Sequence, residues 1–463
     1  MTTATIHDGR RRRLAEAIAR AGGGLAIVPT APMRLRSGDS DHPFRHDSHF
    51  HYLTGFDEPQ AWLLLDDAGR STLLCREKNV ERELWDGIRL GPDAAPAALS
   101  VDEAQPVEAL DKLVTERLAN RSAVWFPFGA HEGLQTRIDG WLAEVRSRDR
   151  SGVQAPGTQR DLTPLLAEMR LFKDDAELAT MRRAAVISAG AHARAMRFCA
   201  QHFRTTPQRG LPEYTIEAEL LHEFRRHGAQ SPAYPSIVAA GANACVLHYA
   251  AGATELQDGQ LCLIDAGCEL DGYASDVTRT FPANGRFSTP QRELYELVVA
   301  AQEAAIAATR PGARKQDAHW AAVRVLAQGM LDVGLLDRHK VGDLDAVLDS
   351  AAYRAFYMHG TGHWLGRDVH DVGEYLALDE KPVEQRDGTG GKVMRKPSRV
   401  LQPGMVLTIE PGLYVRPAAG VPERYWNIGI RVEDDAVVTT DGCELISRGV
   451  PVKADEIEAL MRA

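Results

Sequence analysis

The chain has 463 residues, more than one typical hydrophobic core organises, which indicates two or three domains. Its net charge of −10, with no strong basic stripe beyond residues 10–13, argues against a nucleic-acid partner. No uncharged apolar run reaches the length of a membrane span, and the N-terminus lacks a leader-peptide pattern, so we expect a cytoplasmic protein without a membrane partner. The six cysteines are scattered without paired spacing, which predicts reduced thiols.

The first third of the sequence alternates helical and strand-like segments. Residues 10–21 predict a helix that three glycines end, and a short apolar strand, LAIV, follows. Apolar strand-like runs then alternate with amphipathic helical runs to about residue 150. This alternation predicts a separate α/β domain over residues 1–165. Residues 151–163 are polar and rich in glycine and proline, so we expect a linker there, before a second domain at 170–463.

Four helices are predicted behind this linker. Asp174 and Glu177 have the spacing of a capping box and open a long amphipathic helix. A second helix is predicted after Pro212, over the segment EAELLHEFRRH. Thr289 followed by Pro290 has the N-cap and N1 arrangement that starts a third helix, and the fourth covers roughly residues 315–331.

Four carboxylates and one imidazole interrupt apolar or glycine-rich segments in the last 200 residues. A carboxylate in a buried strand costs free energy unless something replaces its lost hydration. An Asp-Gly turn signal joins the segments LCLIDAG and GYASDVTRTF, which predicts a hairpin that brings their two aspartates to roughly opposite positions. The five side chains are Asp265, Asp276, His363, Glu410 and Glu433.

These five groups, delivered to one place, would hold two divalent metal ions. Two carboxylates roughly 3–4 Å apart do not readily both ionise without a cation between them. Bridging carboxylates in two-metal sites hold the ions about 3.5–4 Å apart. The mostly oxygen donor set suits Mn²⁺, with Co²⁺ and Zn²⁺ as alternatives. The alternative for each residue taken separately is a surface turn or a satisfied salt bridge, but the five together favour the metal site.

The sequence resembles a known family. The resemblance is carried by DAGCELDGYASDVTRTFP, HGTGHWLGRDVHDVG, LQPGMVLTIEPGLY and NIGIRVEDD, which look like signature blocks of proline-specific aminopeptidase P within the pita-bread metallopeptidases. Upstream, HPFRHDSHFHYLTGFDEP and ERELWDGIRLGP resemble the N-terminal domain of the same subfamily. The resemblance extends across most of the chain. It implies an α/β (α+β) protein in which a smaller α/β N-terminal domain precedes a pita-bread catalytic domain.

The resemblance also implies a role for each of the five side chains. Asp265 would bind one metal ion, and Asp276 and Glu433 would bridge both ions. His363 and Glu410 would complete the second metal site. A hydroxide held between the ions would be the nucleophile, because metal coordination lowers the pKa of water toward neutrality. Glu410 would relay the proton of that nucleophile to the departing proline nitrogen.

Further residues are implied to bind substrate and assist catalysis around this centre. His370 would hydrogen-bond the oxyanion of the transition state. His248 and His359 would line the pocket for the proline at the second position, supported by Tyr414 and Arg431. Two other interpretations stay open: the histidine in CVLHY could be a core residue, and the arginine in GIRVEDD could be the counter-ion of the glutamate two positions later.

The implied activity is release of the N-terminal residue from peptides with proline at the second position. Prolidase, which acts on Xaa-Pro dipeptides, is the alternative, because residues 374–398 form a longer segment than in the shorter relatives. Either Arg395 or Arg399 could contact the substrate. A metal-free pita-bread binding module is the alternative of another class. The family also implies a homo-oligomer, a dimer or tetramer, with Trp85 either in the core or near a neighbouring subunit.

Overall fold

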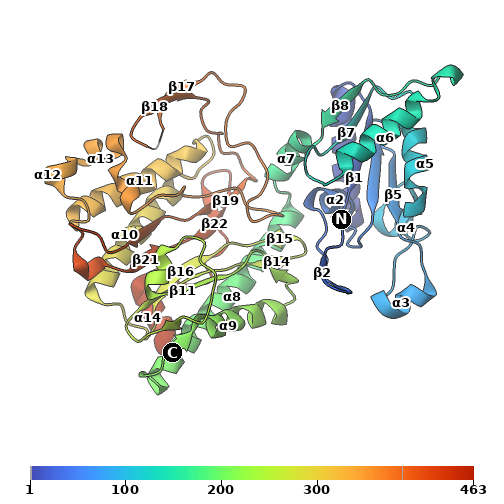
Figure 1. Cartoon of the computed structure of the whole chain (residues 1–463). Coiled ribbons are helices and arrows are strands. Elements are labelled where there is room, and N and C mark those ends of the chain that lie inside the picture. The colour runs from blue at the N-terminus through green and yellow to red at the C-terminus, as the bar shows by residue number, and fades with distance from the viewer. Residues whose placement is uncertain (1–2, 388) are drawn as a thin grey trace. The chain divides into compact units, whose positions relative to one another are not determined.

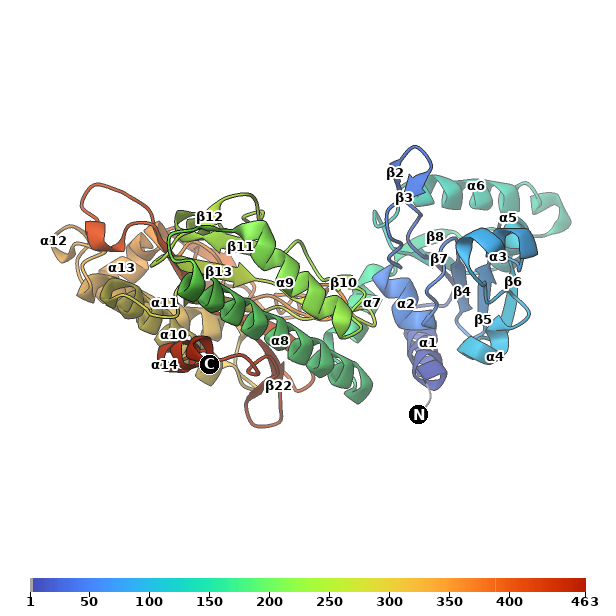
Figure 2. The same ribbon diagram turned by 90° about the horizontal axis from the view of Figure 1, so that it is seen from below.

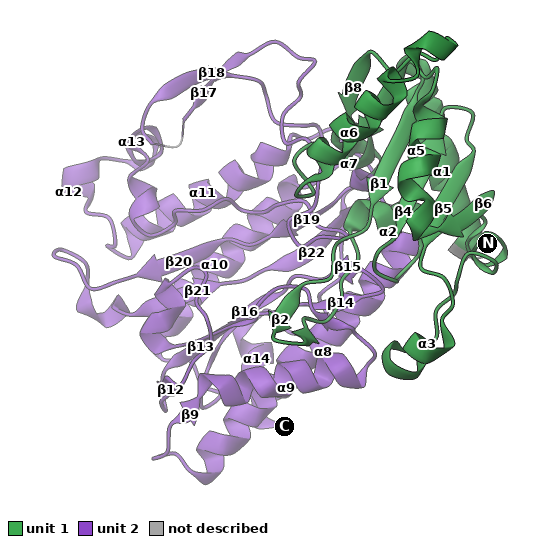
Figure 3. Ribbon diagram, turned by 45° about the vertical axis from the view of Figure 1, so that its right-hand side comes forward, with its two compact units in different colours: residues 1–169 green, residues 170–463 purple. Residues whose placement is uncertain are grey.

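The structure is a computed structural model that describes residues 3–387 and 389–463. The chain divides into two compact units, unit 1 at residues 1–169 and unit 2 at residues 170–463 (Figures 1 and 3). Within the described ranges, no helix combines the length and hydropathy that a membrane span requires. The six cysteines all lie in these ranges and have free thiols.

Unit 1 is built on a mixed sheet of six strands in the order β6-β5-β4-β1-β7-β8. Helices α1 and α2 pack on one face of this sheet, and α5 and α6 pack on the other. Because both faces are covered, the central strands are apolar at nearly every position rather than alternating. The strands are β1 (Leu25–Pro29), β4 (Trp62–Asp66), β5 (Ser71–Cys75), β6 (Glu103–Pro106), β7 (Ala123–Phe126) and β8 (Thr158–Asp161).

The helices of unit 1 include α1 (Thr3–Arg20), α2 (Ser48–Thr54), α3 (Val80–Asp86), α4 (Ala95–Leu99), α5 (Leu110–Leu118), α6 (Leu134–Arg146) and α7 (Thr163–Leu171), which continues into unit 2. A two-stranded ribbon is formed by β2 (Leu35–Ser37) and β3 (Ser40–Asp41). Trp85 on α3 is 86% exposed, which excludes the core position, one of the two alternatives for this residue.

The segment 151–163 is not the linker that its composition suggested. Four of its residues form β8, which pairs in parallel with β7 at the edge of the sheet. Residues of β8 alternate between exposed and half-buried positions and carry no apolar pattern. An edge strand tolerates such polar side chains because one of its sides faces solvent. The sequence of β8 therefore lacks the apolar pattern by which a strand is predicted.

Unit 2 contains four long helices in two packed pairs, α8 with α9 and α10 with α11 (Figure 2). The predicted capping box is confirmed: the Asp174 carboxylate accepts from the backbone of Glu177, whose own carboxylate accepts from the backbone of Asp174. The third helix is capped by Ser288, one residue before the predicted N-cap Thr289, which is itself helical. The helices are α8 (Asp175–Thr205), α9 (Glu213–Arg226), α10 (Thr289–Ala308) and α11 (Lys315–Asp332).

Several short sheets lie beside these helices, in the orders β11-β13-β16, β19-β22-β23, β20-β21 and β10-β14-β15. Their strands are β10 (Ser231–Pro232), β11 (Ile237–Ala240), β13 (Leu261–Asp265), β14 (Cys268–Leu270), β15 (Tyr273–Ala274), β16 (Thr278–Pro282), β19 (Val406–Ile409), β20 (Gly412–Val415), β21 (Ile428–Arg431), β22 (Asp434–Val438) and β23 (Cys443–Leu445). The remaining elements are β9 (Leu211–Pro212), β12 (Glu255–Leu256), β17 (Val383–Arg386), β18 (Lys392–Arg395), α12 (Arg338–Val341), α13 (Leu344–Ser350) and α14 (Ala454–Arg462).

The predicted hairpin is present in a more elaborate form. β13 and β16 pair antiparallel, with Asp265 opposite Thr278. The Asp-Gly turn closes a separate small hairpin, β14-β15, which is inserted between them. Asp276 therefore lies two residues before the partner of Asp265, on the same face of the chain.

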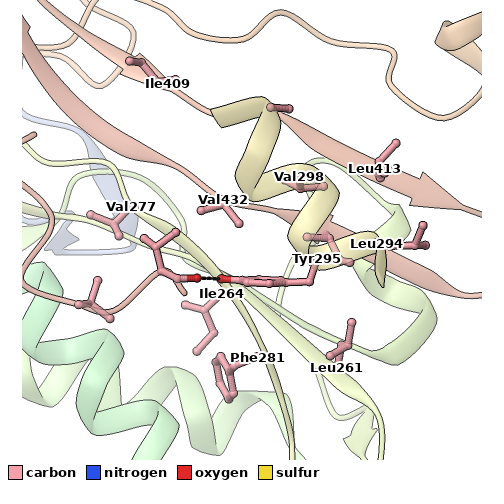
Figure 4. Packing of buried hydrophobic residues seen from close by; sticks show 14 of the residues in the cluster. Leu261, Ile264, Val277, Phe281, Leu294, Tyr295, Val298, Ile409, Leu413 and Val432 are labelled. Carbon is pink, nitrogen blue, oxygen red and sulfur yellow. Dashed lines mark hydrogen bonds between the residues drawn. The ribbon is translucent and has the colours of Figure 1, made fainter. Parts of the chain in front are cut away.

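The core of unit 2 fixes these strands against α10 (Figure 4). Ile264 and Phe281 of the β13–β16 pair are fully buried together with Val298 of α10 and Val432, which lies between β21 and β22. Each such side chain contributes roughly 1.5–3 kcal/mol when fully buried. Tyr295 adds a directional restraint, because its hydroxyl donates to the Val452 carbonyl at 2.6 Å. The strand ends that carry the acids are thus held by a rigid apolar layer.

Candidate metal centre

The five predicted ligands converge on one cavity of about 550 Å³ in unit 2. Asp265 ends β13, Asp276 lies between β15 and β16, and Glu410 directly follows β19. Glu433 lies between β21 and β22, and His363 lies in the glycine-rich loop that the sequence predicted. The same cavity is lined by His248, His359, His370 and Arg431.

Three of these residues already have the geometry of a metal site. Asp276, His363 and Glu433 place one potential ligand atom each within 4.8 Å of one another. Nε2 of His363 lies 3.3 Å from Oδ2 of Asp276 and 3.8 Å from Oε1 of Glu410. Nδ1 of His363 lies 2.9 Å from the Trp364 carbonyl oxygen. Metal-binding histidines commonly use a backbone carbonyl in this way, which directs the other ring nitrogen toward the ion.

The acids are buried close enough to oppose one another's ionisation. Burial, followed by the charges of Asp276, Glu410 and Asp265, raises the pKa of Glu433 well above its usual range. Burial raises the pKa of Glu410 to about 7, although His363 and Arg431 act in the opposite direction. Bound cations remove this conflict, and four carboxylates with one imidazole are a suitable donor set for divalent ions. The residues present therefore fit a divalent metal centre.

Arg431 connects the metal-binding acids to a buried tyrosine. Its guanidinium donates to Oδ2 of Asp265, to the Tyr414 hydroxyl at 3.0 Å and to Oγ1 of Thr278 at 3.2 Å. The ion pair that it forms is therefore with Asp265, and not with Glu433 as the sequence spacing suggested.

The three other histidines line the cavity in different environments. His359 lies with Nε2 2.8 Å from the Tyr414 hydroxyl oxygen, and burial followed by the charge of Arg431 lowers its pKa to about 3. It is therefore neutral at physiological pH. The exposed His370 packs edge-on against His363, with ring centroids 4.3 Å apart. His248 is also exposed at the cavity, so it is not a core histidine.

Two residues that the sequence analysis missed hold the acids in place. The Tyr234 hydroxyl contacts Oδ1 of Asp265 at 2.7 Å and also contacts Oδ1 of Asp276. The Thr278 hydroxyl donates to Glu433. Strand parity could have identified Thr278, since it shares a face with Asp276 two residues away. No motif marks Tyr234, which reaches the site from the segment before β11.

The two arginines proposed as substrate contacts lie in different surroundings. Arg395, at the end of β18, lines a second cavity of about 220 Å³ together with Lys315 and His319. Arg399 stacks over the Phe172 ring at 5.8 Å. The segment 374–398 contains the β17–β18 hairpin, except that residue 388 lies outside the described residues.

Two family models match the sequence. Residues 179–440 match metallopeptidase family M24, and residues 7–125 match the N-terminal domain of aminopeptidase P. The chain belongs to metallopeptidase family M24. The predicted family is thus confirmed, and as an M24 metallopeptidase the protein is a hydrolase that binds divalent metal.

Relatives of this M24 chain match it along nearly its whole length. It is 42% identical to the Xaa-Pro aminopeptidase of Escherichia coli (strain K12), over 100% of this chain and 99% of that protein. It is also 42% identical to the Xaa-Pro aminopeptidase of Haemophilus influenzae, over 92% of this chain and 91% of that protein.

Solved structures confirm the predicted fold class. The aminopeptidase PepP of Pseudomonas aeruginosa is 45% identical, with a TM-score of 0.89 over 98% of this chain and 97% of that one. Aminopeptidase P from Escherichia coli, with the inhibitor Pro-Leu, is 41% identical, with a TM-score of 0.89 over 100% and 98% of the two chains. The M24 chain is therefore a mixed α/β protein with an N-terminal domain and a C-terminal pita-bread domain.

Proposed function

We propose that this protein is a metal-dependent aminopeptidase that releases the N-terminal residue from peptides with proline at the second position. One observation carries the proposal: four largely buried acids and one histidine converge on a single cavity. The full-length similarity to proteins named Xaa-Pro aminopeptidase supports the substrate class. Retention of all five potential ligands disfavours a metal-free binding module.

We assign the five side chains as ligands to two ions. The residues that would hold these ions are Asp265, Asp276, His363, Glu410 and Glu433. Mn²⁺ is the ion that we propose, because the donor set is mostly hard oxygen, with Co²⁺ and Zn²⁺ as alternatives. When bound, the two ions supply the nucleophile by lowering the pKa of water toward neutrality.

The surrounding side chains position the substrate and move protons. Glu410 accepts a proton and delivers it to the proline nitrogen of the leaving peptide. His370, exposed at the cavity, donates a hydrogen bond to the oxyanion. Neutral His359 and exposed His248 line the proline pocket. The Tyr414 hydroxyl contacts His359 and accepts a hydrogen bond from Arg431, which holds Tyr414 beside this pocket.

The first test of this function is metal dependence on an Xaa-Pro-Yaa tripeptide. We expect thorough chelation to abolish turnover and added Mn²⁺ to restore it. Replacing Asp276→Asn should remove bound metal and reduce turnover by more than about 100-fold, because even outer partners of metal ligands cost 10–100-fold. Asp271→Asn, on the exposed β14–β15 turn, is the matched control and should behave as wild type. Turnover that survives complete metal removal would contradict the mechanism.

The second test separates the aminopeptidase from prolidase. We expect the protein to turn over Xaa-Pro-Yaa tripeptides in preference to Xaa-Pro dipeptides. A clear preference for dipeptides would favour prolidase.

Further proposals are that residues 1–165 and 170–463 are the domains of the protein, that the protein forms a dimer or tetramer, and that it acts in the cytoplasm. Light scattering and cell fractionation test the last two.

A further inference from the structure

Unit 1 carries its own cluster of potential metal ligands, to which the proposed peptidase reaction assigns no role. His46, His51 and Asp57 place one ligand atom each within 4.8 Å of one another. All three belong to the short stretch HDSHFHYLTGFD, so the cluster is formed locally by one helix and its flanking turns.

The fold of α2 brings the three side chains together. Asp47 caps the helix by accepting from the Phe50 amide at 2.8 Å, which places His46 just before the first turn. Gly55 ends the helix in the left-handed conformation, with φ of 64°. A side chain at this position would also collide with Nε2 of His7, since a Cβ would approach it within 2.5 Å. The reversal at Gly55 returns Asp57 to the last turn of α2, where His51 lies.

The distances within the cluster resemble those between ligands of one ion. Oδ1 of Asp57 lies 2.8 Å from Nε2 of His51 and 3.1 Å from Nδ1 of His46. The two imidazole rings stack, with centroids 3.8 Å apart and planes inclined by 17°. In a tetrahedral zinc site with bonds of about 2.0–2.1 Å, neighbouring ligand atoms lie roughly 3.3 Å apart. The two distances to Asp57 are therefore within about 0.5 Å of that separation, and all three ligand atoms lie within 4.8 Å of one another.

Burial and charge also suit a metal site that is open on one side. The His46 and His51 side chains are 11% and 12% exposed, whereas that of Asp57 is 74% exposed. Solvent thus reaches the carboxylate edge, where water could complete the coordination of an ion held by three protein ligands. An aspartate carboxylate is ionised at neutral pH, as a metal ligand must be.

We propose that His46, His51 and Asp57 form a second metal-binding site, which takes one Zn²⁺ ion with water as its remaining ligand. Two imidazoles and one carboxylate suit zinc better than manganese, since zinc binds nitrogen donors more tightly. This donor set differs from the carboxylate-rich set in unit 2, so the two sites differ in ion preference.

The test measures the zinc content of the full-length protein by mass spectrometry after equilibrium dialysis against a buffered low zinc concentration. The main variant is Asp57→Asn, because this exposed side chain is not needed for packing, and His46→Ala is the second variant. His42→Ala, an exposed histidine outside the cluster, is the matched control. We expect both cluster variants to hold one zinc ion per chain fewer than wild type, and His42→Ala to hold the wild-type number. Unchanged zinc content in both cluster variants would overturn the proposal.

Chemical labelling locates the ion. Zinc should slow modification of His46 and His51 by diethyl pyrocarbonate at least tenfold in wild type and leave the rate unchanged in Asp57→Asn. Equal labelling with and without zinc in wild type would show that the three side chains only hydrogen-bond to one another and do not bind zinc. The same one-ion difference is expected in an Asp276→Asn background, so this result does not depend on whether the peptidase centre binds metal.

Discussion

Thr278 donates its hydroxyl hydrogen to Oε2 of Glu433 at 2.6 Å, and the Glu433 amide donates to the Thr278 carbonyl at 3.1 Å. Thr278 also lies opposite Asp265 in the β13–β16 pair. One residue thereby fixes two proposed metal ligands that are 168 positions apart in the sequence, by the difference of their residue numbers. This contact joins the N-terminal and C-terminal strands of unit 2 at the candidate metal centre.

Replacing Thr278→Val removes that donor while nearly conserving the side-chain volume. We expect metal affinity to fall about 10–100-fold, because partners that orient metal ligands contribute on this scale. The free energy of unfolding should also fall by about 1–3 kcal/mol, since a buried acceptor loses its partner. Calorimetric metal titration and urea unfolding measure the two effects. Thr309→Val, which removes a buried hydroxyl that donates to the Ala305 carbonyl at the end of α10, should reduce stability without changing metal affinity. Wild-type metal affinity in Thr278→Val would contradict this role.

Tyr234 provides a second test of how the acids are oriented. Burial and then the charges of Asp265 and Asp276 raise its pKa well above the usual range, so its hydroxyl stays protonated at any working pH. In Tyr234→Phe, both carboxylates lose this shared contact, and we expect metal affinity to fall about 10–100-fold. Metal titration measures the change, with Tyr214→Phe, a half-exposed tyrosine, as the control. If Tyr234→Phe binds metal as wild type does, the hydroxyl does not orient the ligands.

The sequence alone predicted the site residues that are charged although their neighbours in the sequence are apolar. Acids such as Asp276 and Glu410 stand out because ionised groups beside apolar strands require compensation when they are buried. Tyr234 does not stand out, since a tyrosine in a mixed segment is unremarkable until the fold brings it to two carboxylates. The partner of Arg431 was also beyond sequence reasoning, because spacing along one strand favoured a neighbour while the actual partner lies on β13. The edge strand β8 was missed for a similar reason: its pairing depends on β7, not on its own composition.

A buried ion-pair network beside His370 yields a prediction about stability. The Asp371 carboxylate accepts from Arg170 at 2.6 Å and from Lys173 at 3.0 Å, and all three side chains are 1% exposed. Replacing Asp371→Asn removes the carboxylate that pairs with buried Lys173 and leaves buried Arg170 with the more exposed Asp368, so we expect the free energy of unfolding to fall by about 3–5 kcal/mol. Asp368→Asn tests the same arginine at a partner that is 36% exposed, and it should cost about 1 kcal/mol or less. Urea unfolding at neutral pH measures both, and equal losses in the two variants would contradict the role of burial.

The loss of the Asp371 ion pairs should also reduce catalysis through the loop that contains His370. Because Asp371 directly follows His370, its anchoring also fixes the backbone of the proposed oxyanion donor. We therefore expect kcat to fall in Asp371→Asn under conditions where the protein remains folded, while KM changes little. A KM effect with unchanged kcat would instead indicate that His370 contributes to ground-state binding.

The stability of the metal-free protein should decrease as the pH rises. Burial lowers the pKa of His363, but the adjacent Asp276 and Glu410 outweigh burial and raise this pKa from 6.5 to about 9. Its contribution is therefore fully present below about pH 6.5 and is lost as the pH rises through about 9. Burial raises the pKa of Glu410 from 4.5 to about 7, so the folded form prefers the protonated acid and loses stability between those values.

Bound metal should reverse this trend, because the proposed ligands bind an ion in their deprotonated forms. We expect the Tm of chelated protein to be several degrees lower at pH 8.5 than at pH 6, and the increase in Tm on adding Mn²⁺ to be larger at pH 8.5. Thermal unfolding with chelator and with saturating Mn²⁺ measures the difference at each pH. Asp276→Asn is the control and should show little stabilisation by Mn²⁺ at either pH. A metal-induced increase that shrinks as the pH rises would mean that protons and ions do not compete for these side chains.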